Sequence, residues 1–256
     1  MYAKKSLGQN FLTSSAIAEG MVREAHLTLE DKVLEIGPGK GILTGALLKH
    51  AGEVIAVEKD RELVRELVRK FYREIEARKL SIIEGDILKF DFSALTSYAV
   101  VANIPYNITG EILRLLLTQK HQPKLVLLMV QKEVAERIVA KDGESLLSLS
   151  VKCYGTPTII RKVSAGSFSP RPKVDSAILK ISGISRDFFA GISEERFFAI
   201  IKAGFAHKRK ILWGNLSEKE SKFKLSPCWN ELGLTRNTRA EELSLETWKK
   251  LVSCLG

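Results

Sequence analysis

The sequence predicts an α/β fold: a doubly wound, mostly parallel sheet followed by a small C-terminal helical domain. Three observations lead to this prediction. Short apolar runs alternate with amphipathic stretches through the first two-thirds of the chain, which is the pattern of successive strand–helix–strand units. A glycine-rich loop follows the first of these runs, and the strand pattern stops near residue 184. Because the neighbouring strands of such a sheet are parallel, they require crossover connections, which are almost always right-handed.

The expected strands are apolar runs that are too short for helices and are bounded by polar residues or glycine. They span residues 32–36, 53–57, 80–83, 98–102 and 125–130. The stretches that separate several of them repeat apolar residues at helical spacing. These expected helices span residues 42–48, 61–73, 109–118 and 132–141. A turn-rich segment at 166–172 precedes an alternating run at 176–181, which predicts one more strand.

A change of character near residues 183–187 divides the chain. From residue 184 onward, short helical stretches are broken by glycine, asparagine and proline, and no strand pattern remains. We therefore expect a first domain over residues 1–183 and a small helical domain over residues 184–256. The second domain holds 13 basic and 9 acidic residues, and the first holds 27 and 21. Both domains are basic, so both are expected to touch a common partner.

Composition and charge narrow the class of protein. The 256 residues are 45% hydrophobic and 27% charged, which excludes a disordered chain, a collagen-like fibre and a disulfide scaffold. The net charge of +10 favours a polyanionic partner. The longest apolar run has six residues, at 125–130, whereas a membrane-spanning helix needs about 20. We expect no membrane partner and no secretory signal, hence a cytoplasmic location.

The cysteines and histidines suggest neither a metal site nor a redox pair. The three cysteines, Cys153, Cys228 and Cys254, are far apart and lack the spacing of metal or redox motifs. In a reducing cytosol we expect all three to be free thiols. None of the four histidines lies beside an expected strand end. The sequence therefore predicts chemistry without a metal.

The glycine loop and two carboxylates are typical of a nucleoside-containing cofactor. Gly37, Gly39 and Gly41 connect the first strand to its helix, and glycine lets the backbone approach a ligand closely. Glu58 ends the next strand, 21 residues after Gly37, where a carboxylate can accept hydrogen bonds from both ribose hydroxyls. The GxGxG spacing does not match the GxGxxG pyrophosphate fingerprint, which disfavours a nicotinamide oxidoreductase.

Two further polar residues follow strands. Asp86 comes directly after the third strand and Asn103 after the fourth. Because ligands bind outside the carboxyl ends of strands in doubly wound sheets, these residues should converge on one crevice with Gly37 and Glu58. Taken alone, Asp86 fits a turn or a helix cap equally well.

The tetrapeptide Asn103-Ile104-Pro105-Tyr106 has a composition that fits chemistry on an exocyclic amine. The side-chain oxygen of Asn103 and the backbone carbonyl of Ile104 can each accept an N–H bond from such an amine. Pro105 stiffens the turn and disfavours α geometry at Ile104. Tyr106 offers a flat face on which a base can stack. An ordinary turn with a core tyrosine is the alternative, which the upstream cofactor loop disfavours.

Together these motifs resemble the ribosomal RNA adenine N6,N6-dimethyltransferases. The resemblance covers nearly the whole chain in order, and the GQNFL start and the FSPRPKVDSA segment are its most specific parts. The matching segments are residues 8–12, 35–44, 85–86, 103–108, 168–177, 205–216 and 239–243. The resemblance implies the housekeeping enzyme of the small subunit, which dimethylates two adjacent adenosines in a hairpin near the 3′ end of the rRNA.

The resemblance implies an S-adenosylmethionine site, with S-adenosylhomocysteine as product. Asn10 and Leu12 would close over the cofactor. Gly37 would lie against its methionine part, Glu58 would hold its ribose, and Asp86 would bind its adenine amine.

The resemblance also implies a pocket for the target base. Asn103 would lie between cofactor and substrate. Phe168 would form the second wall of the pocket, opposite Tyr106, and a buried core aromatic is the alternative for Phe168.

RNA contacts are expected from basic residues in three segments. These are Lys4, Lys5, Arg171, Lys173, Lys208, Arg209 and Lys210. The family commonly carries an RRK-like cluster at the last of these segments, whereas residues 207–210 here read HKRK. Lysine in place of arginine keeps the charge but loses bidentate phosphate geometry.

Two other functions remain open at this point. A large-subunit rRNA dimethylase of the macrolide-resistance type would share the cofactor loop and the tetrapeptide. A non-catalytic ribosome-assembly protein would share the fold, although the intact tetrapeptide at 103–106 disfavours it. The expected partner is small-subunit rRNA within a pre-ribosomal small subunit, and nothing in the sequence demands more than a monomer.

Overall fold

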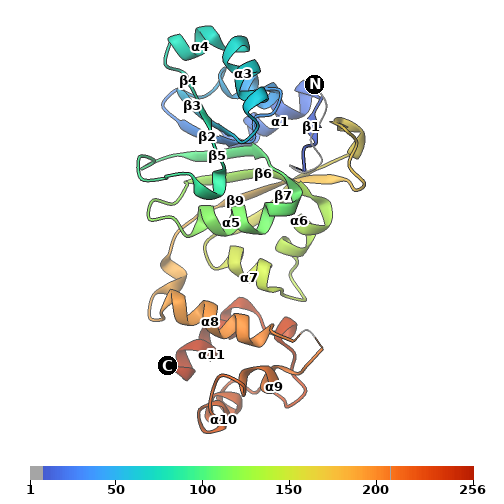
Figure 1. The fold of residues 1–256 in the computed structure, drawn as a ribbon. Helices are drawn as coiled ribbons and strands as arrows, with labels where there is room; N and C mark the ends of the chain where they lie inside the picture. The colour runs from blue at the N-terminus through green and yellow to red at the C-terminus, as the bar shows by residue number, and fades with distance from the viewer. Residues whose placement is uncertain (1–7, 208) are drawn as a thin grey trace. The chain divides into compact units, whose positions relative to one another are not determined.

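A computed structural model describes residues 8–207 and 209–256 of the chain (Figure 1). Its main sheet has seven strands in the order β4-β3-β2-β5-β6-β9-β7. The neighbours from β4 to β6 are parallel, whereas β9 pairs antiparallel with both β6 and β7. The predicted doubly wound, mostly parallel sheet is therefore confirmed.

The strands of the main sheet lie where the apolar runs predict them, with one addition. They are β2 (Lys32–Ile36), β3 (Glu53–Glu58), β4 (Leu80–Glu84), β5 (Ala99–Asn103), β6 (Leu125–Gln131), β7 (Thr156–Val163) and β9 (Ser176–Ser182). The strand β7 was not predicted. Its register with β9 shifts between Ile159 and Arg161, and most of its residues are half-buried or exposed, so it lacks both a clean alternation and an apolar run.

Two further short strands form a separate two-stranded sheet. Antiparallel β1 (Phe11–Leu12) and β8 (Phe168–Ser169) pair Leu12 with Phe168. This pairing joins the start of the described chain to a segment more than 150 residues away.

The helices flank these strands in the chain as the amphipathic stretches predict. They are α1 (Ser15–Ala25), α2 (Ile42–Leu47), α3 (Arg61–Lys70), α4 (Tyr72–Glu76), α5 (Thr109–Leu117) and α6 (Lys132–Val139). The expected helix at 61–73 is divided at Phe71, a buried residue with non-helical backbone angles. The helix α1 was not predicted; Ser14 caps its start, because the Ser14 side chain accepts a hydrogen bond from the Ile17 N–H.

The order of the strands places a ligand crevice in the sheet. The chain runs outward from β2 through β3 to β4, then returns to the other side of β2 and continues through β5 to β6. Connections therefore diverge in opposite directions between β2 and β5, and ligands bind at such a switch point beyond the carboxyl ends of the strands. The first six residues of β6 are all buried, as expected for a central strand that is covered on both faces.

The chain separates into two compact units. The first contains residues 1–135 and 156–184, and the second contains residues 136–155 and 185–256. Within the second unit lie α7 (Leu146–Lys152), α8 (Glu194–Gly204), α9 (Leu212–Leu216), α10 (Lys222–Glu231) and α11 (Leu245–Leu255). Residues 136–155 were expected in the first domain instead. One contact that ties them to the second unit is the Glu144 N–H, which donates to the Glu241 carbonyl at 2.8 Å.

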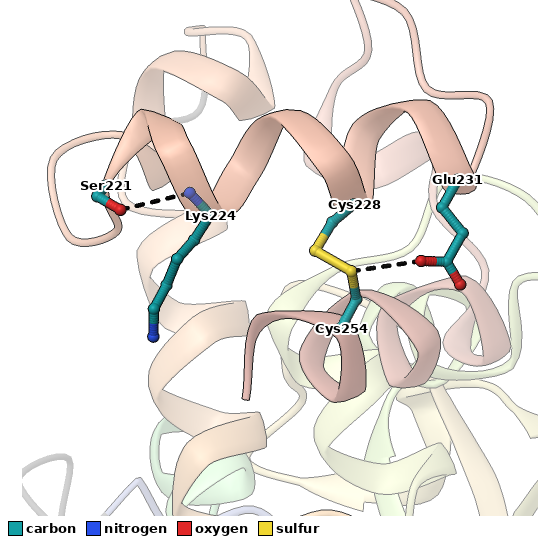
Figure 2. The surroundings of a disulfide bond; sticks show 5 residues. All are labelled: Ser221, Lys224, Cys228, Glu231 and Cys254. Atoms are coloured by element: carbon teal, nitrogen blue, oxygen red, sulfur yellow. Dashed lines mark hydrogen bonds between the residues drawn. A yellow bond between two sulfur atoms is a disulfide. The ribbon is translucent and has the colours of Figure 1, made fainter.

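The expectation of three free thiols is wrong. Cys228 in α10 and Cys254 in α11 form a disulfide, which Figure 2 shows between the two helices. Their 26-residue separation matches no motif, and only the packing of α10 against α11 brings their Cα atoms within 5.8 Å. Cys153 is the free thiol of the described chain, and it is buried.

No helix in the part of the chain that the structure describes is long and apolar enough to cross a membrane.

Candidate functional site

A cavity of about 1120 Å³, counting the space open to solvent, lies in the first unit beyond the carboxyl ends of β2 to β5. Its walls come from the segment 8–12, the glycine loop, and the residues that follow β3, β4 and β5. All the predicted cofactor residues line it, namely Asn10, Leu12, Gly37, Glu58, Asp86 and Asn103. The structure thus brings together residues that are up to 93 positions apart.

The glycine loop has a backbone that side chains would disturb. Gly37, Gly39 and Gly41 all have positive φ, between 58° and 74°, a region that residues with a Cβ rarely adopt. A Cβ on Gly39 would lie 2.9 Å from the ring of Phe11, and one on Gly41 would lie 2.6 Å from the ring of Phe71. The loop is therefore packed tightly against Phe11 and Phe71, while Gly37 and Gly39 line the cavity.

Glu58 holds the glycine loop to the end of β3. Its Oε2 accepts a hydrogen bond from the Gly39 N–H at 3.1 Å, and its Oε1 accepts one from the Asp60 N–H at 2.9 Å. Burial raises the pKa of this carboxyl group. A carboxylate has about four lone-pair sites, so these two bonds leave acceptor capacity toward the cavity.

Asp86 both caps a turn and lines the cavity. Its Oδ1 accepts a hydrogen bond from the Leu88 N–H at 3.1 Å, which starts the 3₁₀ turn η2 (Ile87–Lys89). Its Oδ2 accepts a hydrogen bond from Lys59 Nζ at 2.8 Å, which lowers the pKa of the carboxyl group. The turn role and a ligand-binding role are therefore compatible at this residue.

Asn103, the last residue of β5, is oriented by the N-terminal segment. Its Nδ2 donates a hydrogen bond to the Asn10 carbonyl at 3.0 Å. Because the donor end of the amide is engaged there, its oxygen is left as the acceptor. Gly8 also packs closely here, since a Cβ on it would lie 2.8 Å from Asn107 Oδ1. The segment that would close over a cofactor thus also fixes the amide of the tetrapeptide.

The remaining residues of the tetrapeptide differ in their exposure to the cavity. Ile104 and Pro105 line it, whereas Tyr106 does not. Tyr106 is half-buried, and its hydroxyl hydrogen-bonds with the Ser176 hydroxyl at 2.5 Å. Burial also raises the pKa of the Tyr106 phenol. Its ring is thereby anchored to β9.

Phe168, the other expected wall of a base pocket, is 4% exposed and belongs to the hydrophobic core of the first unit. It lies in β8, opposite Leu12 of β1. It is not among the residues that line the cavity. This position agrees with the core-aromatic alternative, and its role beside a target base stays a prediction.

One cavity residue with a strongly shifted pKa was not predicted from the sequence. Glu35 in β2 is 1% exposed and accepts a hydrogen bond from Thr44 Oγ1 at 2.7 Å. Burial raises the pKa of Glu35 to about 8, so the carboxyl group is largely neutral at pH 7. An acidic residue among the apolar residues of β2, between Leu34 and Ile36, was the signal that could have identified it.

The residues expected to contact RNA lie in both units. Arg171 and Lys173 in the first unit are exposed, as are Arg209 and Lys210 in the second. Lys210 Nζ lies 3.1 Å from a carboxylate oxygen of Glu218. Lys4, Lys5 and Lys208 lie outside the described residues.

No group of three or more histidine, cysteine, aspartate or glutamate side chains suitable for a metal ion occurs within residues 8–207 and 209–256.

The sheet order and the cavity at its switch point define a Rossmann-type α/β protein whose crevice suits a nucleoside-containing ligand. Solved structures share this architecture. The 23S rRNA methyltransferase ErmE matches 96% of this chain and 99% of its own with a TM-score of 0.76 at 24% identity. A dimethyladenosine transferase from Plasmodium falciparum matches 94% and 95% with a TM-score of 0.77 at 27% identity.

The sequence also matches the ribosomal RNA adenine dimethylase family over residues 1–255. The chain belongs to this family, which confirms the resemblance seen in its motifs. A ribosomal RNA small subunit methyltransferase A from Dehalococcoides mccartyi is 42% identical, over 97% of this chain and 87% of the relative. A protein of the same name from Clostridium botulinum is 38% identical, over 98% and 93%.

Proposed function

We propose that this protein transfers methyl groups from S-adenosylmethionine to N6 of two adjacent adenosines in a hairpin near the 3′ end of small-subunit rRNA. The observation that carries the chemistry is the Asn103 amide, whose nitrogen is engaged by the Asn10 carbonyl in a cavity lined by Glu58 and Asp86. The relatives named small subunit methyltransferase A support the choice of rRNA.

The cavity residues fit the parts of the proposed cofactor. Glu58 has acceptor capacity for ribose hydroxyls, and Asp86 has it for the adenine amine. The backbone at Gly37 lies open for the methionine part, since a Cβ there would meet only the Asn103 carbonyl oxygen, at 3.9 Å. Asn10 and Leu12 supply the remaining wall. When bound, the cofactor supplies a sulfonium methyl group that is already activated for transfer.

Asn103 and Ile104 act on the nucleophile. The lone pair of adenine N6 is delocalised into the ring, which makes this amine a poor nucleophile. In the first transfer, the Asn103 side-chain oxygen and the Ile104 carbonyl accept its two N–H bonds and draw the nitrogen toward tetrahedral geometry. In the second transfer, the monomethylated amine keeps one N–H for one of these acceptors. The same acceptors stabilise the positive charge that develops on N6, and this stabilisation is greatest in the transition state.

Positioning supplies much of the remaining rate enhancement. Holding N6 in line with the methyl carbon and the sulfur can lower the barrier by about 7–11 kcal/mol at best. A bound cofactor would supply the methyl group and leave as S-adenosylhomocysteine, and the proton that N6 gives up would pass to water. Tyr106, anchored through Ser176, is proposed to stack on the extruded base, and Phe168 to support the opposite side.

The basic surface residues are proposed to hold the RNA. Arg171, Lys173, Arg209 and Lys210 are exposed, and Lys4, Lys5 and Lys208 extend the set in sequence. Phosphate contacts of this kind make binding weaken as salt increases. We propose that the protein acts as a monomer on a pre-ribosomal small subunit in the cytoplasm, with the second unit as its RNA-binding domain.

Transfer of labelled methyl groups tests this proposal. Small ribosomal subunits that lack the dimethyl mark are the substrate, large subunits are the parallel substrate, and digestion of the RNA locates and counts the methyl groups. We expect dimethyladenosine in small-subunit rRNA only. Label in large-subunit rRNA would contradict the substrate, and cofactor binding without any transfer would favour a non-catalytic role in assembly.

A further inference from the structure

We propose that Phe223, flanked by Lys222 and Lys224 in α10, is a stacking platform for an unpaired base of the RNA substrate. This inference rests on the proposed function and deepens it, because it names a contact that the second unit makes with RNA. Phe223 lies outside the 207–210 basic segment that the sequence analysis singles out.

The exposure of Phe223 is the first observation. Its residue surface is 89% exposed, whereas Phe197, Trp229 and Trp248 of the same unit are at most 4% exposed. The helix α10 turns Leu225, Cys228 and Trp229 inward. An exposed phenylalanine adds nothing to the core and leaves a large apolar surface in water.

The charge around Phe223 is the second observation. Lys222 and Lys224 flank it and are exposed, as is the nearby Lys219. The acidic neighbours already have cationic partners: Glu220 lies 2.7 Å from Arg196, and Glu218 lies 3.1 Å from Lys210. The patch formed by Lys219, Lys222, Phe223 and Lys224 therefore presents excess positive charge around an aromatic ring.

This arrangement works against the stability of the helix. The first turn of α10 contains no acidic residue, although the start of a helix favours negative charge and disfavours lysine. Residues that lower the stability of a helix are expected at functional sites, where a bound partner compensates for the lost stability. An anionic partner would do so, and it would also explain the cationic flanks.

The patch has a rigid support. Ser221 caps α10 by accepting a hydrogen bond from the Lys224 N–H, and the Cys228–Cys254 disulfide joins the same helix to α11 (Figure 2). A recognition side chain on an anchored helix loses little conformational freedom when it binds.

RNA can contact both the aromatic ring and the lysines of the patch. A nucleobase offers a flat face to an aromatic ring, and the phosphates on either side of an unpaired base meet the two lysines. Stacking of this kind is sequence-tolerant and changes affinity by about five- to 150-fold when the aromatic side chain is removed. The family to which the chain belongs acts on RNA, which supplies such bases in its loops.

A tryptophan probe tests the platform directly. In Phe223→Trp, the indole emission in excess of that of the wild type, which has three tryptophans, is measured while the protein is titrated with small-subunit rRNA or with heparin, a polyanion without bases. We expect strong quenching by the RNA and little by heparin. Tyr72→Trp is the matched control, because Tyr72 is a 60% exposed aromatic residue of the first unit, and its emission should change less.

Binding measurements complete the test. Phe223→Ala should weaken RNA binding about five- to 150-fold while cofactor affinity stays unchanged, and Phe223→Tyr should retain most of the binding. Unchanged emission of Phe223→Trp, or equal quenching by heparin, would overturn the platform even if the wild type methylates rRNA. A wild type that neither binds nor methylates rRNA would overturn the proposed function and the platform together.

Discussion

The two units of this protein differ in how their functional residues are held. In the first unit, the cavity residues are fixed by main-chain groups: Glu58 by the Gly39 and Asp60 N–H groups, and Asn103 by the Asn10 carbonyl. In the second unit, the candidate residues are exposed side chains, either in the turn between α8 and α9 or on α10, which a disulfide joins to α11. Chemistry that needs accurate positioning is carried by residues that main-chain groups hold in place. Recognition of a charged polymer tolerates exposed side chains.

The tight packing of the glycine loop gives the largest expected effect. Gly41→Ala adds a Cβ at 2.6 Å from the Phe71 ring to a backbone with φ of 74°. Overpacking and backbone strain together should destabilise the first unit by about 2–5 kcal/mol. Gly183→Ala is the matched control, because Gly183 also has a positive φ but has no atom within 4 Å of its would-be Cβ.

Urea unfolding of both glycine variants measures this difference. We expect Gly183→Ala to show the backbone strain alone, about 1 kcal/mol. Equal free energies of unfolding for the two variants would show that the loop is not tightly packed.

Loss of the disulfide should destabilise the second unit by a comparable free energy. It closes a loop of 26 residues, and removing such a cross-link costs about 2–4 kcal/mol. We expect Cys228→Ser with Cys254→Ser to lower the midpoint of thermal unfolding of the second unit, and reductant to lower it in the wild type only. A wild type that reductant does not affect would contradict this expectation.

Glu35 makes the stability of the first unit depend on pH. Its pKa is about 8 in the folded chain against an ordinary value of 4.5, so between these values the folded state binds more protons than the unfolded state. Stability should therefore fall as pH rises through this window, by up to about 1.4 kcal/mol per pH unit from this group.

The variant Glu35→Gln isolates that contribution. Glutamine keeps an oxygen that can accept the Thr44 hydroxyl bond but does not titrate. Its free energy of unfolding, measured without cofactor from pH 5 to 8, should lack the slope that Glu35 gives the wild type. An unchanged slope would assign the pH dependence to other groups.

The smallest effects are expected from single surface cations. Arg171→Gln and Lys210→Gln should each weaken RNA binding at low salt and reduce the slope of log affinity against log salt by about 1. Binding measured between about 50 and 200 mM salt gives this slope. A slope that neither variant changes would remove these residues from the RNA surface.

The sequence predicted the first unit more fully than the second, for a physical reason. Apolar runs and the residues that follow them place Gly37, Glu58, Asp86 and Asn103 at one edge of a parallel sheet, since strand ends are local features. The bond between Asn103 and Asn10 spans 93 residues and has no local signal.

The second unit depends on such non-local relations. The pairing of Cys228 with Cys254 follows from the packing of α10 on α11, which neither helix encodes by itself. The exposure of Phe223 likewise follows from which face of α10 packs inward. Its flanking lysines resemble any solvated charged stretch, so the sequence alone gave no reason to select it.

The most direct test of the proposed chemistry is Asn103→Ala, with Asn107→Ala as the matched control because Asn107 also lines the cavity. Single-turnover methyl transfer and calorimetric cofactor binding are measured for both. We expect Asn103→Ala to cut turnover about 10²–10³-fold with a much smaller change in cofactor affinity, and Asn107→Ala to stay near wild type. Full activity of Asn103→Ala would contradict the account.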